Sequence, residues 1–406
     1  MSTAASGRPA DTSPDRPPRL PALDALRALG AVGVLAYHVA FNTGVSLHGT
    51  WNGLLARLDV GVAVFFVLSG FLLFRPYAYA KATEAGRPDT GRYLWRRALR
   101  ILPAYWLAVV VCLSVLPQNA NANLNDWVRN VTLTQIYEPA LLRHGLTQTW
   151  SLATEVTFYL VLPLAALATL GRRWRPTRTA VLCLGSVVIT GAWIAAMALG
   201  YLGTALHTMW LPSYAIWFGA GMALATVHVA LATGTAPARW RMINDLAAAP
   251  LACWGLAVGL LAIASTPLAG PRTLVAPTAG EFAVKVALYV VIAALIVMPV
   301  AFGPDNRVTA AFGGGLARWL GAISYGIFLW HPFVIDVTYL ATGWPVFSGD
   351  YLTVFVITLS GALVLASMSW YALERPVQRW GGRWPARRRR RVTESQRAVA
   401  VASAAN

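Results

Sequence analysis

The sequence predicts an all-α integral membrane protein with about ten transmembrane helices and both termini in the cytosol. Hydrophobic residues make up 57% of the 406 residues and charged residues only 12%, about half of the roughly 25% that is typical of soluble domains. Mean hydropathy is +0.55. Apolar stretches recur from residue 23 to residue 373, and basic residues collect on one side of them.

Ten stretches are apolar and long enough to be spans, because a bilayer core of about 30 Å requires roughly 20 helical residues. In chain order they cover residues 23–42, 59–79, 101–117, 149–170, 179–199, 211–231, 247–266, 281–301, 318–340 and 351–372. The third is short, and charge interrupts the first. No linker rich in Pro, Ser or Gly divides the series, so we expect one membrane domain over residues 23–373 of a multi-pass protein of the cell membrane.

The distribution of basic residues predicts the orientation. If the N-terminus is cytosolic, 27 of the 33 Lys and Arg residues fall inside, four fall outside and two lie within spans. This bias and the even number of spans place both termini in the cytosol. The same distribution argues against a nucleic-acid partner in spite of the net charge of +17, because nucleic-acid binders gather basic residues on one folded face.

The two tails differ in composition. Residues 1–22 hold three arginines and five prolines without an apolar core, which predicts a disordered cytosolic tail and not a cleaved signal peptide. Residues 374–406 form a polybasic cytosolic tail, in which five consecutive arginines at 387–391 are expected to bind anionic lipid of the inner leaflet.

Three further features limit the possible chemistry. Cys112, Cys183 and Cys253 lie in different spans, without the spacing of a disulfide framework or a metal site. We therefore predict no metal and no tightly bound cofactor. The outer loop at residues 117–148 has a length typical of functional or disordered loops.

Arg27 and His38 are ionisable residues within the first span, where charge is costly and therefore indicates function. Eleven residues make almost three helical turns and about 16 Å of rise. Both side chains thus share one face, with Asp24 placed to pair with Arg27. The structural alternatives are snorkelling of Arg27 to the inner headgroups and a packing hydrogen bond of His38.

Glu155 is the corresponding signal in the fourth span, within T-Q-T-W-S-L-A-T-E-V-T-F-Y. Ser151 and Tyr159 lie four residues before and after it and share its face. Glu155 lies about two turns below the outer surface and His38 about one turn, so we expect the carboxylate to orient the imidazole as a general base requires. A purely structural contact of Glu155 is the alternative.

Basic residues at the inner mouth of the third span suggest an anion site. Arg96, Arg97 and Arg100 are expected on one side of a helix, and arginine forks match phosphate geometry. Positive-inside charge without a ligand is the alternative. Ser69, in S-G-F-L-L, fits a helix-packing site of small residues, and His331 lies before a proline in the ninth span.

The order of these motifs resembles the acyltransferase-3 family of bacterial membrane proteins. The resemblance rests on D-A-L-R followed by His38, F-F-V-L-S-G-F-L, R-R-A-L-R-I-L-P-A-Y, W-S-L-A-T-E-V-T-F-Y, S-Y-G-I-F-L-W-H-P and E-R-P. It implies a ten-helix fold that binds acyl-CoA on the cytosolic side. The acceptors it implies are hydroxyls of surface polysaccharides, peptidoglycan or glycosylated antibiotics.

The resemblance also implies roles for individual residues. It maps the family's Arg–His pair onto Arg27 and His38, with His38 as the catalytic base, the basic motif onto Arg97 and Arg100, and the acidic position onto Glu155. From the residues themselves we expect Glu155 to orient His38 and Arg27 to steady the thioester or a pantetheine amide; an acyl-histidine intermediate is an open alternative. The expected substrate-binding residues are Arg96, Arg97, Arg100, Tyr105, Ser69, Trp150, Ser151, Tyr159 and His331. The chain resembles a stand-alone form without a fused hydrolase-like domain, similar to short members that acylate macrolide antibiotics.

A transporter or flippase without acyl-transfer chemistry is the competing class. Ten helices and an intramembrane proton relay of Arg27, His38 and Glu155 would fit it as well. Transfer of label from acyl-CoA to a hydroxyl acceptor distinguishes the two.

Overall fold

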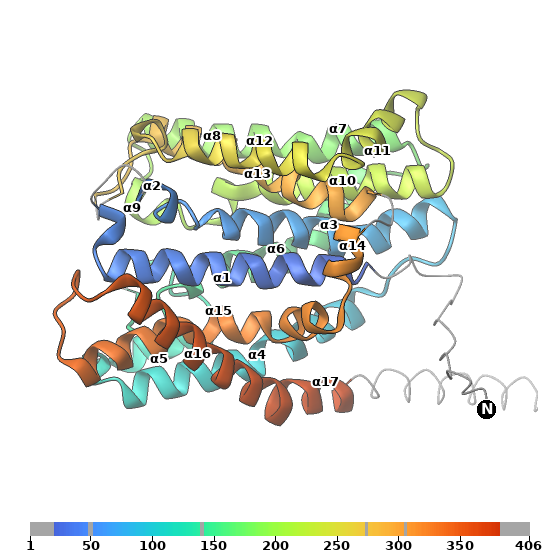
Figure 1. The fold of residues 1–406 in the computed structure, drawn as a ribbon. Helices are drawn as coiled ribbons and strands as arrows, with labels where there is room; N and C mark the ends of the chain where they lie inside the picture. Colours follow the sequence, from blue (N-terminus) through green and yellow to red (C-terminus); the bar gives the residue numbers. More distant parts are fainter. Residues whose placement is uncertain (1–19, 48–51, 139–141, 273–274, 304–306, 382–406) are drawn as a thin grey trace, which may run out of the picture.

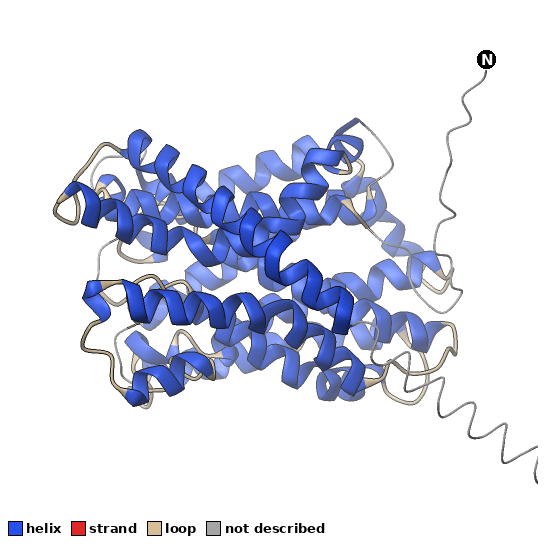
Figure 2. Cartoon of the chain, turned by 90° about the horizontal axis from the view of Figure 1, so that it is seen from below, coloured by secondary structure: helices blue, strands red, loops and turns tan. Residues whose placement is uncertain are grey.

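The protein is an all-α integral membrane protein. The computed structural model describes residues 20–47, 52–138, 142–272, 275–303 and 307–381, and Figure 2 shows helices and loops without a strand in this part of the chain. Among the described residues, nine helices are long and apolar enough to cross a membrane. The helices or helix pairs that form these spans are α1 (Ala22–Asn42), α3 (Val60–Ala82), α4 (Thr90–Val115), α6 (Thr149–Leu170), α7 with α8 (Pro176–Leu184, Ser186–Ala198), α10 (Ala215–Ala232), α13 (Ala279–Phe302), α15 (Gly315–Thr342) and α16 (Tyr351–Ser369).

A tenth crossing is shorter than the others. Helix α12 (Pro250–Ala264) has 15 residues and follows η4 (Ala238–Trp240) and α11 (Arg241–Ala247) at a bend of 80°. It lies beside α13 among the crossing helices (Figure 1). Proline at the first position of α12 forces the break, because it cannot continue the preceding helix. The prediction of about ten spans therefore holds if this bent pair counts as one.

Short helices connect the spans at two ends of the bundle. They are η1 (Val45–Leu47), α2 (Asn52–Leu55), η2 (Pro117–Asn119), α5 (Leu124–Val131), α9 (Thr204–His207), η3 (Leu211–Tyr214), η5 (Pro267–Ala269) and α14 (Arg307–Phe312). After α16 the chain continues through the π-helical turn η6 (Trp370–Glu374) into α17 (Arg375–Gly381). The start of α1 and the end of α17 lie at the same end (Figure 1, right). We name this the inner end, following the predicted orientation, and the opposite end the outer end.

Helix α3 is the centre of the bundle. It packs against α1, α6, α10 and α13, and 78% of its apolar window is buried. Its contact with α10 is close because glycines face backbone: a Cβ at Gly70 would overlap the carbonyl oxygen of Phe218, and one at Gly221 would overlap that of Val67. The S-G-F-L-L motif is therefore a helix-packing site of small residues.

Peripheral helices expose apolar side chains over most of their length. Only 22% of the apolar window of α7 and α8 is buried, and Val188 is 69% exposed. Leu251 on α12 is 78% exposed. A water-facing surface would not tolerate such patches, whereas lipid solvates them at no cost.

The outer loop is ordered over its described residues. Asn123 and Asp126 form a reciprocal capping box at the start of α5, and Arg143 donates to the Asp126 carboxylate. Burial raises the pKa of Asp126, but the Asn123 backbone N–H and the Arg143 guanidinium outweigh burial and hold it below its ordinary value of 3.8. Gln148 then donates to the Leu329 carbonyl at 2.7 Å, which joins the loop to α15.

The last span continues beyond the predicted boundary at residue 373. Helix α17 extends to Gly381, whose carbonyl accepts a hydrogen bond from Trp95 Nε1 at 3.2 Å. The start of the predicted C-terminal tail is thus packed against α4. The five-arginine run and residues 1–19 of the predicted N-terminal tail lie outside the described residues.

Candidate active site

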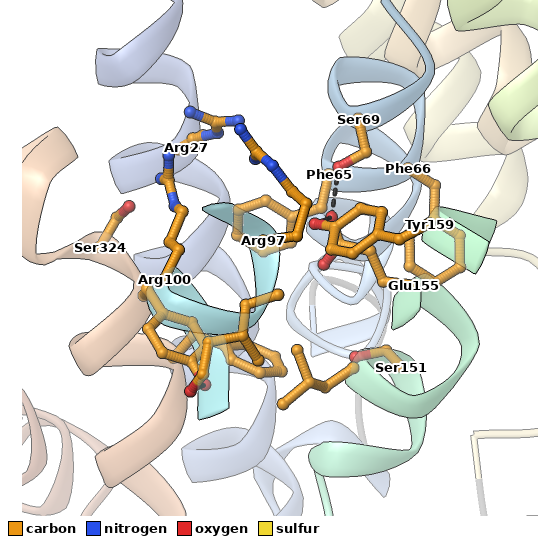
Figure 3. Close-up of a pocket in the computed structure, with 14 residues that line it drawn as sticks. Arg27, Phe65, Phe66, Ser69, Arg97, Arg100, Ser151, Glu155, Tyr159 and Ser324 are labelled. Atoms are coloured by element: carbon orange, nitrogen blue, oxygen red, sulfur yellow. Dashed lines mark hydrogen bonds between the residues drawn. The ribbon is translucent and has the colours of Figure 1, made fainter. Parts of the chain in front are cut away.

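Three arginines from two helices converge on one pocket. Arg27 comes from α1, and Arg97 and Arg100 come from α4, where a spacing of three residues puts them on one face. Figure 3 shows their guanidinium groups gathered on one side of the pocket, with Glu155, Tyr159 and Ser69 on the other. The pocket encloses about 660 Å³, including the space at its mouth.

The arginines outnumber the acids around them. Arg27 donates to Asp24 at 3.2 Å, and Arg97 interacts electrostatically with Glu155. The buried Nε of Arg97 has no hydrogen-bond partner within the described part of the chain, and an unpaired buried donor is costly. The pocket therefore has guanidinium donors in excess of its carboxylates, and such donors match an anion with several oxygen atoms, such as a phosphate.

Glu155 belongs to the arginine pocket and not to the histidine. Ser69 donates to its carboxylate, and Tyr159 donates to the same oxygen at 2.6 Å (Figure 3). Ser151 also lines the pocket and donates to the Gln148 carbonyl at 3.0 Å. The expected direct contact between Glu155 and His38 is wrong, because the two side chains bind different partners.

His38 is instead paired with His331. The Nδ1 atom of His38 lies 2.9 Å from the Val34 carbonyl oxygen and 3.0 Å from Nε2 of His331. The Nδ1 atom of His331 lies 3.1 Å from the Ile327 carbonyl oxygen. The two rings are 4.9 Å apart between centroids, and His331 is fully buried.

These contacts fix the tautomers of the pair. A carbonyl oxygen only accepts, so Nδ1 carries the proton in both neutral rings. The single Nδ1–H of His38 is then shared between two acceptors, the Val34 carbonyl and His331 Nε2, and His38 Nε2 keeps its lone pair. In this arrangement the His38 Nε2 lone pair is available to accept a proton, and His331 holds the orientation of the His38 ring.

Four expected substrate-binding residues lie outside the arginine pocket. One is His331, which contacts His38 as described above. Arg96 is exposed and points away from the pocket, because neighbouring helical residues are about 100° apart and Arg97 takes the inward position. Tyr105 is fully buried and donates to the Asn130 carbonyl at 2.5 Å, which is a packing contact. Trp150 lines a second cavity, near the outer end.

Several residues around the site were not predicted from the sequence. Ser324 and Tyr325 line the arginine pocket. Ser324 lies seven residues before His331, and this spacing could have placed Ser324 and His331 on one helical face. Asp59 acts electrostatically on His38, and Glu374 of the E-R-P motif acts on Arg100. No signal within a single sequence joins these distant pairs.

No group of three or more His, Cys, Asp or Glu side chains in the described residues is placed to hold a metal ion.

The sequence model of the acyltransferase-3 family, described as an acyltransferase domain, matches residues 20–371. The chain belongs to the acyltransferase-3 family. It is therefore a membrane-bound enzyme that transfers acyl groups, and membership of this family favours the enzyme over the transporter alternative.

Three curated relatives of the acyltransferase-3 chain carry informative names. Nodulation protein 10 of Rhizobium leguminosarum bv. viciae is 25% identical over 83% of this chain and 86% of the relative. Exopolysaccharide production protein ExoZ of Rhizobium meliloti is 29% identical over 82% of this chain and 92% of the relative. Peptidoglycan O-acetyltransferase OatA of Listeria monocytogenes is 23% identical over 79% of this chain and 51% of the relative. No solved structure matches the chain.

Proposed function

We propose that the enzyme transfers an acyl group from acyl-CoA, bound in the arginine pocket, to a hydroxyl of a carbohydrate or a glycosylated natural product. The observation that carries this proposal is the convergence of Arg27, Arg97 and Arg100 in a pocket with one carboxylate. Coenzyme A is a polyanion with a long neutral arm, and guanidinium forks bind its phosphates in pairs of parallel hydrogen bonds.

The position of the histidine pair fits this donor. His38 is about 16 Å further along α1 than Arg27, by the rise of eleven residues. An extended pantetheine arm spans such a distance, so phosphates at the arginines would bring the thioester towards His38. Arg27 is then a donor-binding residue, and His38 is the residue that we propose as the catalytic base.

The reaction needs one base that takes a proton from the acceptor hydroxyl and later gives it to the leaving thiolate. His38 Nε2 takes the proton of the acceptor hydroxyl while its oxygen attacks the thioester carbonyl. The resulting imidazolium keeps its Nδ1–H bond to His331, which is stronger in the charged state. When the tetrahedral intermediate collapses, the carbon–sulfur bond breaks and the leaving thiolate takes the proton from Nε2. An ester and free coenzyme A result, and His38 returns to its starting tautomer.

The names of two relatives support a carbohydrate acceptor. One is a peptidoglycan O-acetyltransferase and another is an exopolysaccharide production protein. A macrolide sugar would offer the same hydroxyl chemistry and belongs in the same acceptor panel.

The test uses purified enzyme in lipid nanodiscs with radiolabelled acetyl-CoA and a panel of sugar and macrolide acceptors. Wild-type enzyme should transfer label. Arg97→Ala and Arg100→Ala should each raise the donor KM by roughly 10- to 150-fold, since a hydrogen bond to a charged group contributes about 1.5–3 kcal/mol. Arg96→Ala, on the exposed side of the same helix, is the matched control and should stay within about twofold.

Two results would overturn the proposal. One is the absence of label transfer to any hydroxyl acceptor. The other is normal binding of acetyl-CoA by Arg97→Ala and Arg100→Ala in direct titration, which would leave these arginines as topology signals only.

A further inference from the structure

A second cavity lies at the outer ends of α3, α6, α10 and α13. It encloses about 330 Å³ including its mouth, half the space of the arginine pocket. Its walls combine a pair of opposite charges with a set of aromatic rings. The lining residues are Asp59, Val62, Trp150, Tyr214, Trp217, Phe282, Lys285, Val286 and Tyr289.

Asp59 and Lys285 form the polar part of the wall. Lys285 Nζ donates to Asp59 Oδ2 and Tyr289 OH donates to Asp59 Oδ1, both at 2.5 Å. The side chains of Lys285 and Asp59 are 24% and 20% exposed. The carboxylate has about four acceptor sites and the ammonium has three donors, so each can form further hydrogen bonds through the cavity.

A lysine within a span is costly and indicates function, and no step of the acyl transfer described above uses Lys285. The Asp59 side chain does not cap α3, although it occupies the N-cap position. The pair therefore has no evident role in starting the helix.

Aromatic rings form the rest of the wall. Trp150 lies 5.6 Å from Tyr214 between ring centroids, Tyr214 lies 4.5 Å from Trp217, and Trp217 lies 6.0 Å from Tyr289. Trp150 is the most accessible of these rings, because Tyr214, Trp217 and Tyr289 are buried. Flat rings beside polar groups present both surfaces that a pyranose needs: faces for its carbon–hydrogen bonds and partners for its hydroxyls.

The two cavities differ in the charge of their lining residues and therefore in the class of ligand that each favours. The arginine pocket has three guanidinium groups against one carboxylate, and it favours a polyanion. The outer cavity holds one cation against one anion, so it favours a neutral polar ligand over a phosphate. Asp59 also acts electrostatically on Tyr37 and His38, and α3, which begins directly after Asp59, packs against α1, which carries His38.

We propose that the outer cavity binds one neutral sugar ring of the acceptor, with Trp150 against its carbon–hydrogen face and the Asp59–Lys285 pair bonded to its hydroxyls. This assignment deepens the proposed function and rests on it for the role of the sugar as acceptor. The site brings a hydroxyl from the outer end to His38, while the donor reaches His38 from the inner end.

Binding is tested without catalysis, by saturation-transfer difference NMR on the full-length protein in nanodiscs without a donor. The probes are methyl β-D-glucopyranoside and N,N′-diacetylchitobiose. Ring protons of at least one saccharide should receive saturation from wild-type protein, and Trp150→Ala should lose most of the signal. Trp344→Ala, which removes an exposed aromatic ring at the outer end outside the cavity, should retain it.

Kinetics then test the charge pair. Asp59→Asn and Lys285→Met should raise the acceptor KM about tenfold or more, because each loses a charged hydrogen-bonding partner. Their donor KM should stay within about twofold. Arg143→Gln, which breaks an outer-end ion pair away from the cavity, should leave the acceptor KM unchanged.

The outcomes separate this inference from the proposed function. Unchanged acceptor KM in both charge-pair variants, or a saccharide signal that survives Trp150→Ala, overturns the sugar site alone. Saturation of lipid acyl chains in place of any saccharide overturns it too, because the cavity is then filled by lipid. If wild-type protein fails to transfer label but its saccharide signal depends on Trp150, the proposed function fails and the sugar site is supported.

Discussion

The hydrogen bond between the two histidines leads to a quantitative prediction about His331. His331 does not line the arginine pocket, where the phosphates of the donor are proposed to bind. Its single link to the chemistry is Nε2, which accepts from His38 Nδ1 at 3.0 Å. Replacing His331 with phenylalanine keeps a ring in this fully buried position and removes that acceptor.

The size of the effect follows from the charge on His38 in the transition state. His38 is neutral before proton abstraction and cationic afterwards, so the bond to His331 strengthens during the reaction. Losing a hydrogen bond to a charged group costs about 1.5–3 kcal/mol. His331→Phe should therefore lower kcat by roughly 10- to 150-fold, since each 1.36 kcal/mol is a factor of ten. His38→Ala should abolish transfer.

The assay is label transfer from acetyl-CoA, with kcat and both KM values measured separately. Both KM values should change little in His331→Phe, because the contact strengthens only after the ground state. His331→Gln offers a side-chain oxygen to His38 and should restore part of the loss. Full kcat in His331→Phe would refute the positioning role. A fully inactive but folded His331→Gln would refute it as well, because the imidazole itself would then be required.

Three further predictions concern orientation, packing and acid stability. A reporter that is active only outside the cell should be active when fused after Gln135 and inactive after Arg175; activity at the second site would reverse the orientation. Tyr105→Phe removes one of two hydrogen bonds to the Asn130 carbonyl, which still accepts from the Leu133 N–H, and should cost about 0.5–1.5 kcal/mol of stability. It should lower the temperature of thermal unfolding without changing either KM, and a selective rise in one KM would restore a substrate-binding role. Because the folded pKa of Asp126 lies below 3.8, its contribution to stability is complete above that value and decreases as pH falls through the lowered pKa. Asp126→Asn should remove this part of the acid dependence in pulse-proteolysis experiments, and an unchanged pH profile would contradict the assignment.

Hydropathy predicted the spans that face lipid or apolar neighbours. The fourth span was expected at residues 149–170, and α6 covers the same residues. The third was expected to begin at residue 101, whereas α4 begins at Thr90. Its first turns carry arginines, which lower hydropathy, yet Arg97 and Arg100 turn into the protein. A window average does not distinguish a charge that faces lipid from one that faces a pocket.

The site was predictable within each helix and not between helices. The three-residue spacing of Arg97 and Arg100 gives one face on a single helix, and they do line one pocket. The partner of His38 depends on which side of α15 faces α1, and that depends on how helices pack across the bundle. Depth alone suggested Glu155, whereas packing brought His331 to His38.

The glycine contact between α3 and α10 has a consequence for how this enzyme can vary. Helix α3 carries Ser69 in the arginine pocket, and the chain at the start of α10 carries Tyr214 in the outer cavity. A methyl group at Gly70 or Gly221 would separate the two backbones and so displace a wall of both cavities at once. If the two cavities bind donor and acceptor as proposed, side chains that line only one cavity can change one preference alone, whereas a change at this crossing alters both together. Random mutagenesis selected for a new acceptor should accordingly leave these two glycines untouched.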